Sequence, residues 1–384
     1  MSSIPFALPE IGEDEINEVV DSMRSGWVTT GPKTKKFEEN FAEYIGVTHA
    51  LAVNSATSGL HLALDAIGIK RGDKVIVPVN TFTSTGEVVR YFDADPVFCD
   101  IDPDTFNISI TALEDLLENH PDKDKFKAII PVHIAGQACE MDEIFELSKK
   151  YNLKIVEDAA HALPTTYKGK VIGTLSDITV YSFYATKTLC TAEGGMVVTN
   201  NDEYAKRIKV MRLHGFNRDA WNRYNSDKPA WFYEIVAPGF KYNMPDLSAA
   251  MGIHQLAKAD LFFERRNKIA GMYNEAFKDL DKITTPFIKR ASDKHAFHLY
   301  ILKVPNRDEF IQKMSEKGIG TSVHFIPLHI QPYWKEKYNL KDSDFPIAMN
   351  NFPQLMSLPI YTKLSNAEVK TIINAVREIY EEIV

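Results

Sequence analysis

The sequence contains little cysteine. Its 384 residues include only Cys99, Cys139 and Cys190, and their spacing matches no metal-binding motif. Few cysteines, odd in number, are typical of a reducing compartment and do not form a disulfide framework. We therefore expect a cytoplasmic protein without a metal site.

Long apolar runs are also lacking. No stretch approaches the roughly 20 apolar residues that a membrane-spanning helix requires. The residues Met1–Pro5 are not a basic region followed by an apolar run, so no signal peptide is expected. We expect a soluble protein with no membrane partner.

An excess of positive charge is missing as well. The net charge is −8 and the isoelectric point lies near 5.8, so no basic field exists to neutralise the phosphates of a nucleic acid. The sequence has no GxGxxG, P-loop or HExxH motif. Dinucleotide binding, nucleotide hydrolysis and zinc-dependent hydrolysis therefore lack their usual signals.

What the sequence does contain is an alternation of short apolar runs with amphipathic stretches. The amphipathic stretches between the runs, such as Met141–Tyr151, have the length of helices. Strands alternating with helices in this way predict an α/β fold with a mostly parallel sheet covered on both faces. The expected strands are His49–Val53, Lys74–Pro78, Pro96–Asp100, Ala128–Val132, Leu153–Glu157, Ile178–Phe183 and Met196–Thr199.

The chain is too long for one ordinary core, so we expect two domains. We place a large domain with an N-terminal arm at residues 1–246 and a smaller C-terminal α+β domain at 247–384. Before the boundary lies an irregular, aromatic-rich stretch with Trp221, Tyr224, Trp231, Phe232 and Tyr233. After it we expect a long bridging helix, Leu247–Phe263, strands at Phe297–Lys303 and Thr321–Phe325, and a final helix at Ala367–Ile383.

Two strand ends carry residues suited to catalysis. Asp158 follows the strand Leu153–Glu157, and Lys187 follows the strand Ile178–Phe183. Taken alone, the first is more often a helix cap and the second a surface lysine. Together they fit pyridoxal 5'-phosphate (PLP), which needs an amine for a Schiff base and a carboxylate beside its ring nitrogen. Lysine can also move the proton during the reaction.

A phosphate group would need donors rather than bulk charge. Asn54–Gly59 lies between a strand and a helix, where backbone N–H groups, hydroxyls and the helix dipole favour an anion. Simple N-capping would explain these residues equally well. Ser182 could add a donor, and Phe82 could lie against the cofactor ring, although a phenylalanine there is more often part of a core.

Six segments resemble a known family. In their order along the chain, they are similar to the PLP-dependent sugar-nucleotide aminotransferases of the DegT/DnrJ/EryC1/StrS family, and the likeness extends from Phe6 to about Tyr361. One segment alone is a weak signal, but six in family order are specific. The segments are Ser25–Pro32, Asn54–Gly59, Glu157–His161, Ser182–Gly195, His214–Gly215 and Lys241–Met244.

The resemblance implies a fold-type I PLP enzyme that works as a homodimer with shared active sites. It implies that Lys187 carries the cofactor, Asp158 pairs with the ring nitrogen and Phe82 stacks on the ring. His161 would contact the ring or its phenolic oxygen. The residues implied at the phosphate are Ser55, Ala56, Thr57 and Ser182, with Asn243 reaching in from the other subunit. From sequence alone, Asn243 would more readily be interpreted as a turn residue.

Within the family, the chain most resembles the UDP-4-amino-4-deoxy-L-arabinose aminotransferases. Phe82 stands where that branch carries tryptophan, and the loop Ile326–Leu328 before His329 differs from the branch's usual loop. The second difference lies in the substrate region and leaves the sugar open. The shared features are Trp27–Pro32, Pro131–His133, Ala135–Gly136, Tyr167–Gly169 and Gly318–Thr321 leading to His324 and Phe325.

The family's substrates are nucleoside-diphosphate keto sugars, with L-glutamate as the expected amino donor. The residues implied to contact substrate are Phe6, Thr29, Thr30, Gly31, His324 and His329. We expect amination of a UDP-linked 4-keto sugar for polysaccharides such as lipopolysaccharide. A 3-keto sugar or a cyclitol remains an alternative. A related PLP-dependent dehydratase is disfavoured by Lys187, where such enzymes carry histidine, and a non-catalytic PLP-binding regulator does not require this set of residues.

Overall fold

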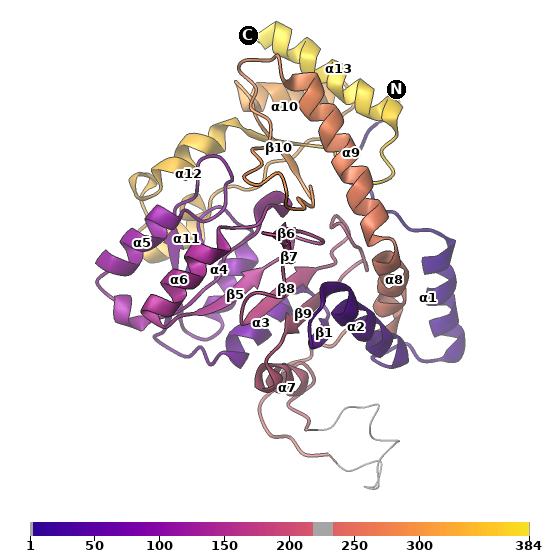
Figure 1. Ribbon diagram of the computed structural model, residues 1–384, viewed down its shortest axis with the longest axis vertical. Helices are drawn as coiled ribbons and strands as arrows, with labels where there is room; N and C mark the ends of the chain where they lie inside the picture. Colours follow the sequence, from indigo (N-terminus) through magenta and orange to yellow (C-terminus); the bar gives the residue numbers. More distant parts are fainter. Residues whose placement is uncertain (1–2, 218–232, 384) are drawn as a thin grey trace.

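The computed structural model describes residues 3–217 and 233–383 (Figure 1). Trp221, Tyr224, Trp231 and Phe232 of the aromatic-rich stretch lie outside the described residues. Around a central sheet, helices gather on both sides, and the C-terminal helices form a second layer at the upper end of the view in Figure 1.

The central sheet has seven strands in the order β1-β9-β8-β5-β4-β2-β3. All of them run parallel except β9, which is antiparallel to both of its neighbours. The predicted α/β fold with a mostly parallel sheet is confirmed. The strands are β1 (His49–Val53), β2 (Lys74–Pro78), β3 (Asp95–Cys99), β4 (Phe126–Ile129), β5 (Lys154–Asp158), β8 (Ile178–Ser182) and β9 (Gly195–Thr199), and β6 (Thr166–Tyr167) and β7 (Lys170–Val171) form a separate hairpin.

Both faces of the sheet are buried because successive residues of its strands point to opposite sides. In β5, Ile155 belongs to one apolar cluster and Val156 to the other. The first face is covered by α2 (Pro32–Ile45), α5 (Ile110–Asn119), α6 (Met141–Tyr151) and α8 (Asp246–Ala257), and the second by α3 (Ala56–Ala66), α4 (Thr83–Arg90) and α7 (Asp202–Met211).

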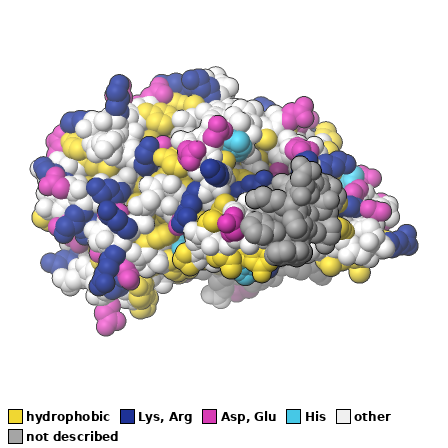
Figure 2. All heavy atoms as spheres, turned by 90° about the horizontal axis from the view of Figure 1, so that it is seen from below, with side chains coloured by type: hydrophobic (Ala, Val, Ile, Leu, Met, Phe, Trp, Pro, Cys, Tyr) yellow, Lys and Arg dark blue, Asp and Glu magenta, His cyan; other side chains and the backbone are white. Residues whose placement is uncertain are grey.

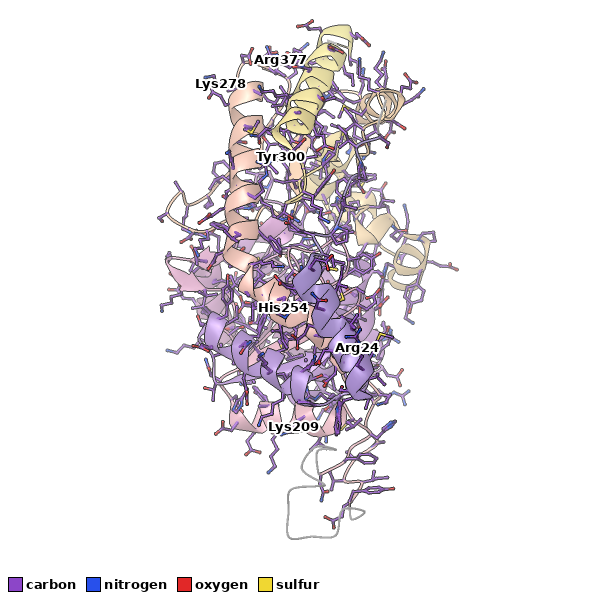
Figure 3. The ribbon with its side chains drawn as sticks, turned by 90° about the vertical axis from the view of Figure 1, so that its right-hand side faces the viewer. Arg24, Lys209, His254, Lys278, Tyr300 and Arg377 are labelled. Carbon is purple, nitrogen blue, oxygen red and sulfur yellow. The ribbon has the colours of Figure 1, made fainter. Side chains whose placement is uncertain are left out.

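A third core forms the small domain. The antiparallel pair β10 (Tyr300–Lys303) and β11 (Leu355–Leu358) packs with three helices. Figure 3 shows α9 running along the molecule to Lys278, with Arg377 of the C-terminal helix beside it and Tyr300 beneath; Arg377 pairs with Asp279 at 2.7 Å. The three helices are α9 (Ala259–Phe277), α10 (Arg307–Glu316) and α13 (Asn366–Ile383). Two shorter helices, α11 (Pro332–Tyr338) and α12 (Pro346–Asn351), return to the large domain's second face.

The packing of α8 and α9 refines the domain division. Ala249 and Ile253 of α8 lie in the large-domain core, where α8 also packs against α1 (Glu13–Ser25), whereas Ile269 and Tyr273 of α9 lie in the small-domain core. In packing terms the division lies between α8 and α9 rather than at residue 247. The expected single helix Leu247–Phe263 is wrong, because the chain breaks at Lys258.

Lys258 has a reason to interrupt the helix. Its backbone departs from helical geometry, with φ −101° and ψ 0°. Its Nζ lies 2.9 Å from the Glu15 carboxylate and 3.3 Å from that of Asp14, both on α1. The break therefore coincides with an ion-paired contact between α1 and the start of the small domain.

The segment Thr321–Phe325 is not the predicted strand. Only Ser322 makes a bridge, to Ser357 of β11. The residues Ser322, His324 and Phe325 instead turn toward the interface of the two domains and line a cavity there. Within the described residues, no helix is long and apolar enough to cross a membrane.

Candidate active site

A cavity of about 470 Å³ lies where β5 and β8 end and α3 begins. It is the edge at which parallel α/β sheets bind ligands. The predicted residues that line it are Phe6, Ser55, Ala56, Thr57, Phe82, Asp158, His161, Ser182, Lys187 and His324. The structure therefore brings the lysine, the acid, the hydroxyl-rich helix start and two histidines to one site.

Lys187 stands in the turn after β8, where its backbone N–H donates to the carbonyl of Tyr184 at 2.8 Å. Burial lowers the pKa of Lys187 to about 8, against the attraction of Asp158. Near neutral pH a useful fraction of this amine is therefore unprotonated and can attack an aldehyde carbon.

Asp158 ends β5 and is almost fully buried. Its carboxylate accepts hydrogen bonds from Thr85 Oγ1 at 2.9 Å and from the backbone N–H of Ala160 at 3.1 Å. Burial raises the pKa of Asp158, while these donors and Lys187 lower it. A cationic ring nitrogen placed beside this carboxylate would offset the cost of its burial.

A fully buried network supports Asp158 from the preceding residue. Glu157 Oε2 lies 2.8 Å from His133 Nε2, and Thr179 Oγ1 donates to Glu157 Oε1 at 2.9 Å. The backbone N–H of Cys139 donates to His133 Nδ1 at 3.1 Å. Because Nδ1 is an acceptor, the imidazole proton lies on Nε2 and points to Glu157. These contacts fix the end of β5.

The start of α3 forms a cradle with free donors. Ser55 caps the helix, accepting the N–H of Ser58 at 3.1 Å. A Cβ on Gly195 would stand 2.8 Å from the backbone nitrogen of Ala56, so glycine is what lets β9 approach this loop. With Thr57 and Ser182 also at the cavity, backbone N–H groups, hydroxyls and the helix dipole suit a phosphate. An amine, a carboxylate and a phosphate cradle together fit PLP.

His161 and His324 enter the cavity from opposite domains. His161 Nδ1 accepts the N–H of Ala135 at 3.3 Å, and burial lowers its pKa well below the usual value. His324 Nδ1 lies 2.9 Å from Ser357 Oγ, and burial lowers its pKa to about 4. Both imidazoles are therefore neutral at pH 7.

The N-terminal arm completes the wall of the cavity. Ile4 pairs with the loop at Gly318 and Gly320 of the small domain, through N–H to carbonyl bonds of 2.9 and 2.8 Å. This places the ring of Phe6 on that of His324, with centroids 5.4 Å apart. Phe82 reaches the cavity from the large domain and is 57% exposed, which leaves its face free for a ligand.

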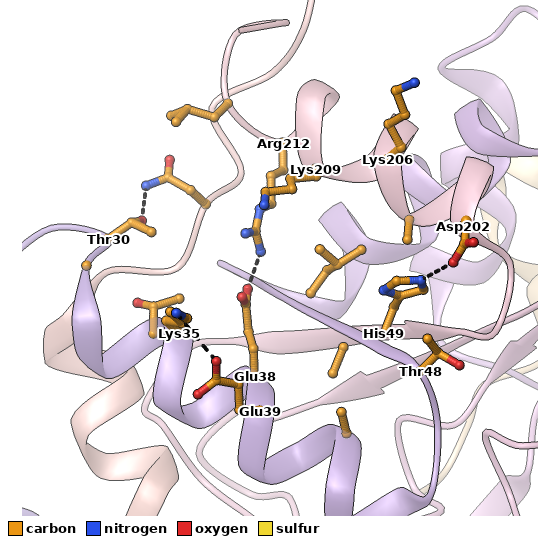
Figure 4. Close-up of a pocket in the computed structure, with 18 residues that line it drawn as sticks. Thr30, Lys35, Glu38, Glu39, Thr48, His49, Asp202, Lys206, Lys209 and Arg212 are labelled. Carbon is orange, nitrogen blue, oxygen red and sulfur yellow. Dashed lines mark hydrogen bonds and ion pairs between the residues drawn. The ribbon is translucent and has the colours of Figure 1, made fainter. Parts of the chain in front are cut away.

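Other predicted residues lie elsewhere in the chain. Thr30, Gly31 and Asn243 line a second cavity of about 770 Å³, drawn in Figure 4. Asn243 Nδ2 donates to Thr30 Oγ1 at 2.5 Å, and the carbonyl of Thr29 accepts the N–H of Asp246 at 3.1 Å. Within one chain these residues do not reach the cavity of Lys187.

The second cavity carries charges of both signs. Figure 4 shows Arg212 directed at Glu38 and His49 at Asp202 across its wall, and the second pair is 2.7 Å apart. Figure 2, which views this lower end of the molecule, shows basic and acidic side chains interspersed. The lining therefore offers paired charges rather than a uniform field.

His329 stands apart from both cavities. Its side chain is fully buried against Phe345, with ring centroids 4.6 Å apart. Neither ring nitrogen has a hydrogen-bond partner among the described residues. This position gives no support to a substrate contact.

Sequence reasoning missed several residues of the site. Thr85 lies on α4, far from Asp158 in sequence, and no motif links them. Ser322 and Glu193 line the cavity without a distinguishing pattern. His298 also lines it, and the sequence analysis assigned that segment only to a strand.

Comparison with known proteins agrees with this geometry. Residues 9–377 match the DegT/DnrJ/EryC1/StrS aminotransferase family. The chain is 49% identical to the uncharacterized protein MJ1066 of Methanocaldococcus jannaschii, over 99% of this chain and 98% of that protein. It is 46% identical to the spore coat polysaccharide biosynthesis protein SpsC of Bacillus subtilis, over 98% of this chain and 97% of that protein.

The fold matches a solved structure over its whole length. Spr1654 of Streptococcus pneumoniae, assigned as a sugar aminotransferase, superposes in its PMP form with a TM-score of 0.91 at 35% identity, covering 99% of this chain and 100% of that one. Its PLP form superposes with a TM-score of 0.90. The chain belongs to the DegT/DnrJ/EryC1/StrS family and is a PLP-dependent sugar aminotransferase.

Proposed function

We propose that the protein transfers the amino group of L-glutamate to the keto group of a nucleoside-diphosphate sugar, and that this sugar is a UDP-linked 4-keto sugar. The observation that carries the proposal is the meeting of Lys187, Asp158 and the start of α3 in one cavity. The choice of sugar rests on the resemblance of Trp27–Pro32 and Tyr167–Gly169 to the UDP-4-amino-4-deoxy-L-arabinose branch.

The chemistry that PLP supplies when bound is an electron sink at its protonated ring nitrogen. Asp158, held by Thr85 and Ala160, would keep a proton on that nitrogen. The cradle at Ser55 and Thr57 would hold the phosphate and so orient the cofactor.

Lys187 both anchors the cofactor and moves the proton. With its Nζ free, Lys187 would take the proton from the donor's α-carbon and pass it to the bound cofactor. In the second half-reaction it would move a proton in the opposite direction, to the sugar carbon that receives the amine. Burial lowers the pKa of Lys187 to about 8, which brings both the amine and the ammonium form within reach near neutral pH. The two half-reactions together form a ping-pong cycle.

The second cavity supports a homodimer with shared active sites. Thr29, Thr30, Gly31 and Asn243 lie away from Lys187 in their own chain. We propose that they contact the cofactor phosphate and the substrate bound to a second copy. In that arrangement each active site would be complete only in the dimer.

The test is a half-reaction followed by absorbance of the bound cofactor. PLP-loaded protein mixed with L-glutamate should convert to the pyridoxamine form and release 2-oxoglutarate, whereas Lys187→Ala should not. The pyridoxamine form of the protein is then mixed in turn with a UDP-linked 4-keto sugar, a UDP-linked 3-keto sugar and a cyclitol acceptor. If glutamate converts the wild-type protein to the pyridoxamine form, but that form does not prefer the 4-keto sugar, transamination would be supported and the choice of acceptor would be overturned.

Two other functions predict different outcomes. A dehydratase would release a sugar that has lost a hydroxyl group rather than one that has gained an amino group, and Lys187 stands where such relatives have histidine. A non-catalytic regulator would bind PLP and leave its spectrum unchanged on addition of any amino acid.

A further inference from the structure

His298 occupies a position in the cavity that the mechanism above does not use. It lies just before β10, a strand of the small domain, and is 6% exposed. Its ring centroid is 4.3 Å from that of His161, with the rings tilted by 38°. Its Nδ1 is buried without a hydrogen-bond partner among the described residues. A buried nitrogen without a partner is unfavourable, and because Nδ1 has almost no accessible surface, the ring nitrogen of His298 that a ligand in the cavity would bond is Nε2.

Hydrogen bonds from Arg266 hold the backbone at His298 in place. Arg266 of α9, itself buried, donates from Nη1 to the carbonyls of Phe297 at 3.2 Å, His298 at 3.4 Å and Ile360 at 2.6 Å. These bonds tie the segment to α9 and to the chain that follows β11. Because Arg266 bonds only backbone carbonyls here, it does not engage the imidazole of His298, which lines the cavity.

The charges around His298 are few. Among the described residues of this chain, the lysines and acids that line the cavity are Lys187, Asp158 and Glu193, and no arginine lines it. Burial lowers the pKa of His298 well below its usual value, and the neighbouring His161, Lys187, Arg266 and His324 lower it further. The imidazole is therefore neutral at physiological pH.

A neutral donor suits a site that binds two unlike substrates in turn. An arginine would pair well with an amino acid carboxylate, but it would be left as an unpaired buried charge when an uncharged sugar ring takes its place. A neutral imidazole donates one N–H to a carboxylate, and it can donate to or accept from a hydroxyl. The same side chain can therefore serve both half-reactions without leaving a charge unpaired.

We propose that His298 recognises both substrates, donating a hydrogen bond to a carboxylate of the amino donor and then bonding a hydroxyl of the sugar ring. This inference rests on the proposed function and assigns the recognition of its two substrates to one residue. It makes His298 a specificity-determining residue rather than a mover of protons.

Two variants and one control separate recognition from structure. His298→Gln keeps a neutral N–H donor, and His298→Phe keeps a ring but no polar atom. His298→Leu replaces the second if it does not fold. The control is His295→Asn, because His295 is also buried but lies outside the cavity lining, where its Nδ1 accepts the N–H of Phe297 at 3.0 Å.

The first measurement uses succinate, a dicarboxylate that cannot transaminate. Its dissociation constant from PLP-loaded protein is read from the cofactor absorbance. We expect His298→Phe to raise it about tenfold, the effect of losing one hydrogen bond to a charged group. His298→Gln and His295→Asn should stay close to wild type, and all variants should retain PLP.

Three results would overturn the assignment. In the first, the wild-type protein does not bind succinate. In the second, His298→Phe binds succinate as tightly as the wild type does. In the third, both His298→Phe and His298→Gln lose PLP. The last would show a structural role.

The glutamate half-reaction then separates this inference from the proposed function. In His298→Phe the glutamate concentration giving half the maximal rate should rise about tenfold, while the rate at saturation changes little. A fall in the saturating rate alone would instead make His298 a mover of protons and overturn the proposal. If glutamate does not convert the wild-type protein but succinate binding still depends on His298, L-glutamate is not the amino donor and the carboxylate site at His298 is supported.

Discussion

Thr85 Oγ1 donates a hydrogen bond to Asp158 Oδ2 at 2.9 Å, and Thr81 Oγ1 lies 2.8 Å from Thr85 Oγ1. The residues come from α4 and the loop before it, and all three side chains are buried. A carboxylate with one side-chain donor and one backbone donor keeps its orientation without water. The aspartate at the ring nitrogen is thus positioned by a residue that belongs to no recognised motif.

Replacing Thr85 by valine removes this donor while keeping the shape of the side chain. The pKa of Asp158, already raised by burial, should rise further, and its hold on a protonated ring nitrogen should weaken. We expect PLP to bind about tenfold more weakly, as measured by equilibrium dialysis against free cofactor. Thr85→Ser should bind PLP as wild type does; equal losses in both variants would show that the methyl group matters instead.

The protonation of Lys187 should be visible in stability. Its folded pKa of about 8 lies below the value near 10.4 of an unfolded lysine. Between these values the unfolded chain binds more protons, so the free energy of unfolding rises with pH across that window. Cofactor-free Lys187→Met should therefore unfold at a higher temperature than wild type at pH 7.

This advantage should shrink as the pH rises through 8 and vanish near 10.4. Thermal unfolding of both cofactor-free proteins at four pH values from 7 to 10 checks it. The exposed Lys370 supplies the control, since Lys370→Met should show no such dependence. A difference between Lys187→Met and wild type that stays constant with pH would contradict a buried, charged lysine.

Gly195 should be intolerant of a side chain. A Cβ there would lie 2.8 Å from the backbone nitrogen of Ala56 and 2.9 Å from the carbonyl oxygen of Ser55. Gly195→Ala should displace the phosphate cradle and weaken PLP binding at least about tenfold, since small displacements of positioning groups have large effects. Fluorescence titration with PLP measures it.

A glycine in α9 offers the matched control. Outside the backbone of its own helix, no atom lies within 4 Å of the point where a Cβ on Gly271 would stand. Gly271→Ala should therefore leave PLP binding unchanged and stabilise the helix by about 0.5–1 kcal/mol. If both alanine variants bind PLP equally well, the cradle is not where the phosphate sits.

Shared active sites can be tested by mixing inactive variants. Lys187→Ala lacks the anchor, and Asn243→Ala lacks the side chain that bonds Thr30 at 2.5 Å. If Asn243 serves the partner's site, a mixed dimer contains one site with both defects and one intact site. Random mixing should then restore about a quarter of the wild-type sites. An activity of the mixture no higher than the mean of the separate variants would place Asn243 in its own chain's function only.

Several strands and helices of the large domain were predictable from local patterns. His49–Val53 and Lys74–Pro78 form strands with the predicted ends, and Met141–Tyr151 forms the predicted helix. Local patterns suffice there because each segment is buried on the faces that its periodicity indicates. Lys187 and Asp158 could be paired from sequence because consecutive strand ends of a parallel sheet meet at one edge.

Other features depend on contacts that local patterns do not record. The helix break at Lys258 accompanies its ion pair with Glu15, and Thr321–Phe325 alternates like a strand although its residues line a cavity. Thr85 and His298 gain their roles only when distant segments pack together. His329 looked like a ligand contact beside a proline, but the fold places it in a core.

The docking of the N-terminal arm has a consequence for how the protein is made. Phe6 is synthesised before the central sheet, yet its ring rests on His324, and Ile4 pairs with the loop at Gly318 and Gly320. The wall of the cavity therefore closes only after the chain has been synthesised beyond His324. A nascent chain can assemble the sheet before that point, but it cannot enclose its cofactor.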